Sequence, residues 1–451
     1  MTAPLDVDAV RRAAAPVLEL RGADEVEIVV SASDTGVTRY ANSEIIQNTA
    51  RRETRAYVRV AAGNRVATAS TNQLTLTELL AAGSNALEAA RTSPDDPAFP
   101  GFPTTEQADG PFAVRRYDES AAAADPRHRS EAVQEILKIT ADASAAGVYE
   151  TSSHAFAIFN SHGVDRADAY TRCVTTCLVD NGIATGWGEA SSHAVDEVDV
   201  GAAARRAVDK AQTGRRRGSA ERGIYEVVLE PAATAMLIEY LSYTGFGAKS
   251  MIEGESFLSK RRGERVGGPG VTVLDDVWHP RSIGIGFDFE GMPRRRVAVI
   301  DDGEASQPVT DLRTAKSLGV TSTGHNSGSN EFGPYASNVV MEPGDAAFEE
   351  LVAAVDDGFL VTRFHYVNVL DRPDTLLTGM TRDGTFRIQK GEVTEAVDNF
   401  RFAQSVLAAL DSVLGIGREL LTFAPDYGAF GSSVAPAVRV GAFDFATQTS
   451  H

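Results

Sequence analysis

The chain has 451 residues, 43% of them hydrophobic and 23% charged, a composition typical of a folded globular protein with more than one domain. Its net charge of −19 argues against binding the phosphate backbone of a nucleic acid, because such binding requires clustered Lys and Arg. The two "RRR" runs, at 215–217 and 294–296, are short and flanked by acidic sequence, so we expect both at the solvated surface.

The sequence indicates a cytoplasmic protein. The N-terminus has no basic stretch followed by an apolar one, and no run approaches the roughly 18 apolar residues of a membrane span. The two cysteines, Cys173 and Cys177, lie four residues apart in the strand-like segment "YTRCVTTCLVD". An extended chain separates them by roughly 13 Å, whereas a disulfide requires Cα atoms within about 7 Å. We therefore expect two reduced, buried thiols.

Residues 1–215 contain the same order of elements twice, which predicts an α+β domain built from a duplicated αβββα unit. In the first pass we predict helix 6–20, strands 25–33, 52–62 and 64–71, and helix 76–91. In the second pass we predict helix 130–145, strands 149–160, 169–180 and 182–191, and helix 199–212. Thr75, with Glu78 as a possible capping-box partner, and Asp199 are the expected N-caps.

The two passes are joined by a proline-rich connector, residues 92–128, which holds six of the 18 prolines. A connector of this length is either disordered or functional. The sequence leaves two interpretations open, an arm that covers a substrate or partner and a plain surface connector.

Residues 220–451 form the second predicted domain, reached through the linker "GRRRGSAERG" at 214–223. It begins with strand 224–230 and the apolar helix 231–243, and it is β-rich afterwards. Further expected elements are β segments around 270–276, 283–291, 294–303, 358–370 and 384–393, and helices at 345–356 and near 402–414. The Asp-Gly pairs at 302–303 and 383–384 are typical of hairpin turns.

Familiar catalytic motifs are absent: the sequence has no G-x-S-x-G, no S-x-x-K and no P-loop. One histidine, His325, lies beside Asn326 in the Gly/Ser-rich loop "STGHNSGSNEFG", a place where a substrate could be held. We keep both residues as candidate substrate-binding groups, together with Tyr243.

The segment "MLIEYLSYTG" at 236–245 places one carboxylate, Glu239, inside an apolar helix. Burying it costs several kcal/mol unless it is paired, protonated or bound to a metal. Met236, Glu239 and Tyr243 share one helical face. Spacing alone favours a core helix whose Glu is neutralised by an Arg from elsewhere.

The order of several segments resembles the TldD/PmbA family, once called modulators of DNA gyrase. The resemblance is specific over 224–443 and weaker over the N-terminal repeat. It rests on the Glu239 helix and on the segments "GESFLSKRRGERV", "FDFEGMPRRRVAVIDDGE", "TDLRTAKSLGVTSTGHN", "SNVVMEPGD", "LLTGMTRDGTFRIQKGEVTEAVDNFRFAQSVLAAL" and "APAVRVGAFDF".

In the TldD branch of that family, the resemblance implies a zinc peptidase helix with the pattern H-E-x-x-x-H and a third ligand, a cysteine, from a late loop. Here Glu239 occupies the general-base position, whereas Ile238 and Tyr243 occupy the zinc-ligand positions. No cysteine follows Cys177. An isoleucine has no lone pair and a neutral tyrosine is a poor zinc ligand. The chain is thus similar to the TldE (PmbA) branch, without metal or other cofactor of its own.

For such a chain the resemblance implies a heterodimer with a TldD-like partner that carries the zinc and acts on small or unfolded peptides. Homodimers are possible, and neither a nucleic acid nor a membrane is an expected partner. Two alternatives stay open. The first is a self-sufficient homodimeric hydrolase rebuilt around His325, Glu239 and Tyr243, and the second is a peptide-binding module without activity.

Overall fold

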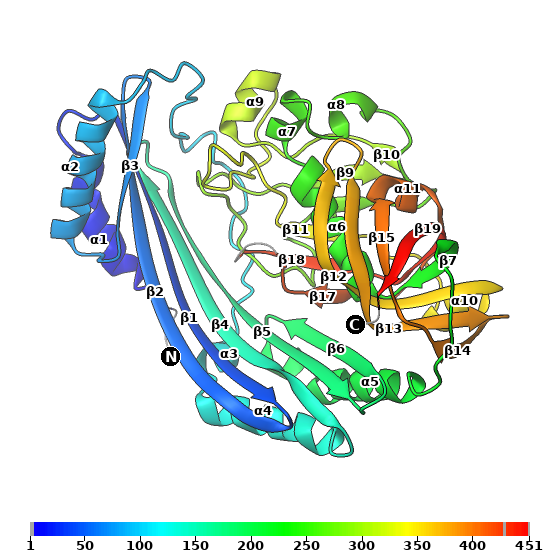
Figure 1. Cartoon of the computed structure of the whole chain (residues 1–451). Helices are drawn as coiled ribbons and strands as arrows, with labels where there is room; N and C mark the ends of the chain where they lie inside the picture. The colour runs from blue at the N-terminus through cyan, green and yellow to red at the C-terminus, as the bar shows by residue number, and fades with distance from the viewer. Residues whose placement is uncertain (1–3, 427–429, 450–451) are drawn as a thin grey trace.

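The computed structural model describes residues 4–426 and 430–449. Its first part is a six-stranded antiparallel sheet of long, curved strands (Figure 1). The strand order is β3-β2-β1-β4-β5-β6. The strands are β1 (Glu25–Ala41), β2 (Glu44–Ala62), β3 (Arg65–Thr71), β4 (Ser144–Asn160), β5 (Asp165–Asp180) and β6 (Thr185–Ser192).

Helices cover one face of this sheet because alternate strand residues are apolar there. The helices are α1 (Val7–Leu18), α2 (Leu76–Thr92), α3 (Glu119–Ala123), α4 (Pro126–Ile139) and α5 (Val200–Thr213), with a 3₁₀ turn, η1, at Val195–Glu197. Ile28 and Val30 of β1 are fully buried in the core shared with α1 and α2. The predicted N-caps are confirmed, since Thr75 accepts from Glu78 N and Asp199 accepts from Ala202 N.

One predicted helix is displaced. Residues 130–145 were expected to be helical, but α4 spans Pro126–Ile139 and β4 begins at Ser144. The shift follows from local chemistry: the Asp125 side chain accepts from His128 N, and Pro126 occupies the first helical turn, where its missing N–H costs nothing.

β1 and β4 are the two central strands of the sheet. On each side of them the next two strands follow in chain order, β2 and β3 on one side and β5 and β6 on the other. This arrangement suits the predicted repeat, which stays a prediction, as do the domain boundaries. Cys173 and Cys177 of β5 are free and buried, as predicted.

The connector 92–128 is packed between the two parts of the chain. Phe99 and Phe102 are buried against β2 and β3, and Phe112 packs edge-on against Phe287 at 6.3 Å between ring centroids. Asp96 accepts two hydrogen bonds from the guanidinium of Arg313, at 3.1 and 2.6 Å. The proline-rich segment therefore acts as a strap between the N-terminal sheet and the rest of the molecule.

The remaining chain forms two further sheets. One has the order β10-β9-β8-β11-β18-β17. The other has the order β12-β7-β19-β15-β13-β14, and a β12–β13 pairing closes five of its strands into a ring, with β16 added on β19. The strands are β7 (Gly223–Leu229), β8 (Val273–Asp275), β9 (Val297–Asp301), β10 (Glu304–Ala305), β11 (Asn338–Met341), β12 (Asp357–Asp371), β13 (Leu376–Gln389), β14 (Glu392–Ala396), β15 (Asn399–Ser405), β16 (Val413–Ile416), β17 (Leu421–Phe423), β18 (Ser432–Ala435) and β19 (Val438–Thr449).

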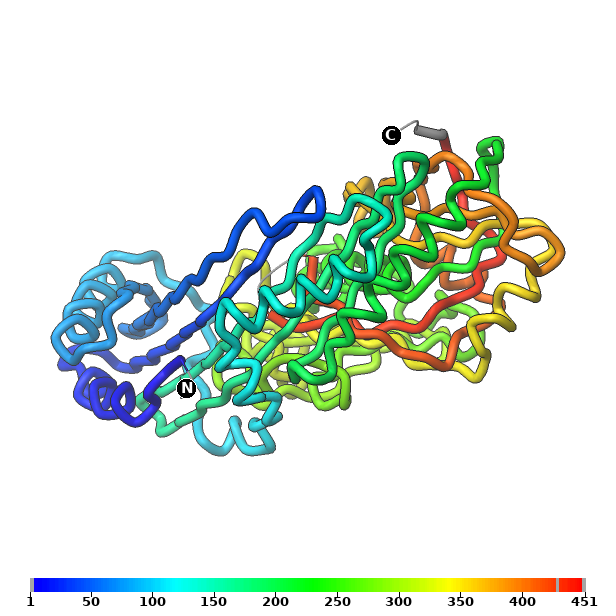
Figure 2. The backbone as a smooth tube through the Cα atoms, turned by 90° about the horizontal axis from the view of Figure 1, so that it is seen from below, coloured from blue at the N-terminus to red at the C-terminus, as the bar shows by residue number. Residues whose placement is uncertain are grey.

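Helix α6 lies between these two sheets and contacts strands of both. The other helices of this part are short and peripheral: α7 (Ala248–Ile252), α8 (Leu258–Arg261), α9 (Leu312–Leu318), α10 (Phe348–Ala353) and α11 (Val406–Asp411). Figure 2 shows the two parts side by side along the long axis, with α1 and α2 at the end far from the closed sheet.

Several C-terminal predictions require correction. Residues 283–291 form no strand, and most of the helix expected near 402–414 is divided between β15 and α11. The Asp-Gly pair at 302–303 makes the predicted turn between β9 and β10. The pair at 383–384 does not; it lies inside β13 as a bulge opposite β12, with φ of 54° and 136°.

The described residues thus form a mixed α+β, β-rich protein. None of the described helices is long and apolar enough to cross a bilayer.

Candidate functional site

Helix α6 (Pro231–Gly245) carries the residues that the sequence singled out. Pro231 opens it, and apolar residues lie all around its surface because two sheets sandwich it. Ile238 is fully buried, Glu239 is 4% exposed and Tyr243 is half-buried. The Glu position therefore lies inside the protein.

The carboxylate of Glu239 is held by the chain itself. Its Oε1 accepts a 2.7 Å hydrogen bond from the backbone N–H of Asp426, and Ser433 Oγ donates to its Oε2 at 3.4 Å. Backbone and hydroxyl donors stabilise the carboxylate in this buried place. The predicted arginine partner is not among these two contacts.

A second carboxylate approaches the same segment from the N-terminal sheet. Burial raises the pKa of Glu189, on β6, to about 7; Arg363, the Ala424 N–H and Arg206 oppose this, and the charge of Glu239 adds to it. Two acidic side chains, one on β6 and one on α6, thus accept hydrogen bonds from the backbone N–H groups of Ala424 and Asp426. No local pattern singles out Glu189, which has the setting of an ordinary strand residue in "GWGEAS".

Tyr243 faces a cavity of about 580 Å³ that Ser242, Lys249, Tyr335 and other residues of the loop 329–335 also line. Its ring lies 5.4 Å from that of Phe332, and the guanidinium of Arg372 lies 5.5 Å above it. Burial raises the pKa of Tyr335, and the charge of Glu239 raises it further. The Tyr335 phenol next to this cavity is therefore a neutral hydrogen-bonding group.

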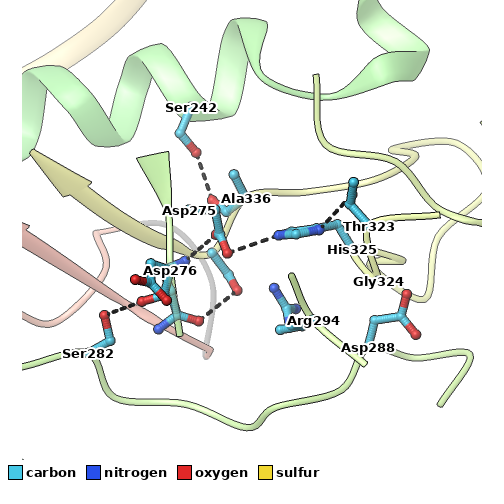
Figure 3. A network of polar contacts seen from close by, with 12 residues as sticks. Ser242, Asp275, Asp276, Ser282, Asp288, Arg294, Thr323, Gly324, His325 and Ala336 are labelled. Carbon is cyan, nitrogen blue, oxygen red and sulfur yellow. Dashed lines mark hydrogen bonds and ion pairs between the residues drawn. The ribbon is translucent and has the colours of Figure 1, made fainter. Parts of the chain in front are cut away.

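His325 lies in the interior (Figure 3), and Asn326 is buried beside it. His325 is 0% exposed; its Nε2 lies 2.9 Å from Asp275 Oδ1 and its Nδ1 lies 3.0 Å from Thr323 Oγ1. The Asn326 backbone N–H donates to Asp288 Oδ2, and its side-chain oxygen accepts from Gly328 N. Both side chains are buried and organise the loop, and none of these bonds joins them to Glu239 or Tyr243.

The prediction that the arginine run 294–296 lies at the solvated surface is wrong for one of its three residues. Arg295 and Arg296 are exposed, but Arg294 is 8% exposed and lies beside Asp275 and Asp288. Burial alone would raise the pKa of Asp275, yet the charges of His325 and Arg294 and the hydrogen bonds from His325 and Asn338 N lower it overall. This is a buried charge network with a structural role.

The α6 residues do not fit a zinc ion. Ile238 offers no donor atom, the Tyr243 ring is engaged with Phe332 and Arg372, and both thiols lie on β5. Within the described ranges 4–426 and 430–449, no group of three or more His, Cys, Asp or Glu side chains is arranged to hold a metal. The described donors around Glu239 are N–H and O–H groups, which suit a carboxylate and not a metal cation.

Comparison with known proteins identifies the family. The model of the PmbA/TldA metallopeptidase C-terminal domain matches residues 222–447, and that of the central domain matches residues 109–215. The chain belongs to the PmbA/TldD family. This assignment confirms the resemblance seen in the sequence, and it accounts for the apolar helix with its single Glu.

Individual relatives are distant in sequence. A metalloprotease of Methanothermobacter thermautotrophicus is 24% identical over 69% of this chain and 70% of its own length. A zinc metalloprotease TldD homolog of Saccharolobus solfataricus is 23% identical over 44% of each chain, so that match spans less than half of either protein.

Solved structures share the whole fold. TldE from Thermococcus kodakarensis superposes with a TM-score of 0.85 at 20% identity, covering 97% of this chain and 99% of that one. A candidate modulator of DNA gyrase from Thermotoga maritima gives a TM-score of 0.82 at 19% identity, with the same coverage. At this identity, the likeness establishes the architecture of the PmbA/TldD chain and nothing finer.

Proposed function

We propose that this PmbA/TldD protein is a TldE-like, non-metal subunit of a cytoplasmic zinc peptidase that acts on small or unfolded peptides. The zinc and the chemistry reside on a TldD-like partner, and this chain supplies scaffold and part of the substrate chamber. Nucleic acid is not a ligand in this proposal. The single observation that carries it is the Glu239 carboxylate, bonded by Asp426 N and Ser433 while Ile238 and Tyr243 flank it.

The argument is one of donor chemistry. A catalytic zinc site needs neutral imidazoles or thiolates around the metal and a Glu free to take a proton from bound water. In this chain the ligand positions hold an alkyl group and a phenol, and the Glu accepts hydrogen bonds from the protein. The helix therefore stabilises the fold where a metallopeptidase would use it for catalysis.

A self-sufficient hydrolase built on His325, Glu239 and Tyr243 receives less support. Catalysis requires the acting groups within hydrogen-bond reach of one substrate. His325 is fully buried, and both of its ring nitrogens already lie within hydrogen-bond distance of protein oxygens. A peptide-binding module without activity remains the second candidate, since the Tyr243 cavity of about 580 Å³ is large enough for side chains of a peptide.

The test compares the chain alone with the chain co-expressed with a TldD-like protein. We expect no stoichiometric zinc by mass spectrometry of the metal and no peptidase activity for the chain alone. We expect co-purification, zinc and activity for the pair. Zinc and activity in the chain alone would overturn the proposal; a stable pair that binds peptides without cleaving them would favour the binding module.

A further inference from the structure

The outer edge of β2 is open over most of its length. β3 pairs with β2 only from Ala56 to Ala62, and the chain leaves the sheet after Thr71. Residues 44–55 pair with β1 on their other side, and within the described part of the chain no backbone hydrogen bond joins them to a third segment. Figure 1 shows β2 continuing well beyond the end of the short β3. Such an edge is a template for an added strand.

The geometry defines which backbone groups point outward. The two-residue turn at 63–64 makes Ala62 and Arg65 a hydrogen-bonded pair, so even-numbered residues of β2 face the β3 side. Asp24 N donates to Ala61 O at 2.9 Å, which places the odd-numbered residues toward β1. Beyond β3, the outward N–H and C=O groups belong to Asn48, Ala50, Arg52 and Thr54.

The equivalent edge on the other half of the sheet is closed. β6 covers β5 from Cys173 to Asp180. The connector continues this cover, since Thr171 N donates to Arg116 O at 2.8 Å and Asp118 N donates to Thr171 Oγ1 at 2.9 Å. The chain thus protects one edge with its own strap and leaves the β2 edge without one.

An unpaired cation lies beside the open edge. Arg51 and Arg52 form ion pairs with Glu53 and Asp34, but Arg55 is exposed and forms no ion pair with any described residue. Its guanidinium stands 6.0 Å from the ring of Tyr57. Both side chains line a cavity of about 780 Å³ over the concave face of the sheet. A residue of an added strand opposite Arg55 would lie about 5 Å away and could pair with it.

We propose that the open edge of β2 binds an extended peptide segment as an additional antiparallel strand, with a carboxylate of that segment paired to Arg55. Main-chain hydrogen bonds to residues 48–54 supply affinity without regard to sequence, and Arg55 selects acidic segments. The inference rests on the proposed function for its ligand class, a peptide. The carboxylate belongs either to an Asp or Glu side chain or to the free C-terminus.

The test uses the full chain alone, with fluorescence anisotropy of a labelled peptide that alternates Thr and Glu. Ala50→Pro removes one outward N–H that does not pair with β1, and we expect at least tenfold weaker binding. N-methylation of alternate peptide residues should have the same effect. A peptide with Gln in place of Glu lacks the side-chain carboxylates, and a peptide with an amidated C-terminus lacks the terminal carboxylate. Comparing the two shows which carboxylate pairs with Arg55.

Charge reversal tests Arg55. Arg55→Glu should weaken binding of the acidic peptide about tenfold and improve binding of a Thr/Lys peptide. Arg12→Glu is the matched control, because Arg12 is exposed on α1 and forms no ion pair with any described residue; it should leave the affinity unchanged. Far-UV circular dichroism and the melting temperature establish that each variant is folded.

Two results would overturn the inference. One is peptide binding that neither Ala50→Pro nor N-methylation changes. The other is a homodimer, seen by sedimentation, that Ala50→Pro dissociates, since the edge would then be occupied by a second copy. Peptide binding at the β2 edge needs neither zinc nor a partner. A failure of this binding experiment therefore does not affect the peptidase test, and a failure of the peptidase test does not affect the binding experiment.

Discussion

The N-terminal sheet and the C-terminal core differ in how completely they satisfy their buried polar groups. Among the described residues, all but two of the buried side-chain atoms without a hydrogen-bond partner lie in the first 215 residues. They include Glu27 Oε2, Arg129 Nε and two nitrogens of Arg172. The two exceptions are Arg294 Nη1 and Thr362 Oγ1.

In the C-terminal core, by contrast, two buried carboxylates each accept at least two hydrogen bonds. Asp288 accepts from three backbone N–H groups, and Asp275 accepts from His325 and from Asn338 N. A fully bonded polar network fixes one arrangement of the loops, whereas an incompletely bonded one costs free energy. The difference indicates that hydrogen bonds to Asp275 and Asp288 fix the buried loops of the C-terminal part, whereas the N-terminal sheet buries several polar atoms without a hydrogen-bond partner among the described residues.

The largest effect should come from removing Asp275, the centre of the buried hydrogen-bond network. Asp275→Ala leaves His325 and Asn338 N without an acceptor and leaves Arg294 facing less negative charge. We expect a loss of about 3–5 kcal/mol in the free energy of unfolding, measured by urea denaturation. A loss below about 1 kcal/mol would show that the network is not the fixed centre we describe.

A smaller effect should follow at the helix α6. Glu239→Ala leaves the Asp426 N–H without its acceptor and creates a cavity, for an expected loss of about 2–4 kcal/mol. Glu239→Gln keeps an acceptor oxygen and should stay within about 1 kcal/mol of the unmodified chain. In the complex with a TldD-like partner, Glu239→Gln should also retain peptidase activity. Collapse of activity in a chain that remains folded would instead support the self-sufficient hydrolase.

Acid clusters should make stability depend on pH. Burial, with Asp288 and Asp311 nearby, raises the pKa of Glu290 well above its ordinary value despite Arg59 and the Leu312 N–H. Burial raises the pKa of Asp288 to about 6, although its backbone N–H donors and the charge of Arg294 act to lower that pKa. Since the folded state binds these protons more tightly than the unfolded state, stability falls as the pH rises from about 4 through 6 and beyond.

Glu290→Gln should therefore make the melting temperature less dependent on pH. At pH 8 we expect the melting temperature to rise by about 1–3 °C. Glu106→Gln is the control, because Glu106 is exposed. A profile that Glu290→Gln leaves as steep as before would contradict the assignment.

The smallest effect is expected in the N-terminal sheet. The Arg172 side chain is 13% exposed, and it has an ion pair with Glu150 at 3.6 Å but no hydrogen bond at Nε or Nη1. Arg172→Met removes these unsatisfied groups and keeps the length of the side chain. We expect a change within about 1 kcal/mol, or a gain, in urea denaturation. A loss as large as that of Asp275→Ala would remove the contrast between the two parts.

Local chemistry made much of the fold predictable. N-caps at Thr75 and Asp199 and alternating apolar residues located the helices and strands of the first half. Prediction failed where pairing partners decide the structure. Asp383 and Gly384 have the composition of a turn, yet β12 continues past them and makes them a bulge. His325 has the loop setting of a binding residue, yet Asp275 and Thr323 hold it in the interior.

The sequence by itself determined the family, the mixed α+β class and the replacement of both ligand positions beside Glu239, because these depend on residue type and order along the chain. Only the tertiary structure decided which groups bond to Glu239, among them the Asp426 N–H and Ser433, and that Glu189 approaches the same segment from the N-terminal sheet. It also decided that β2 has an open edge and β5 a closed one. Contacts between residues nearly 200 positions apart leave no local pattern, because their free energy arises only when distant strands and helices pack together.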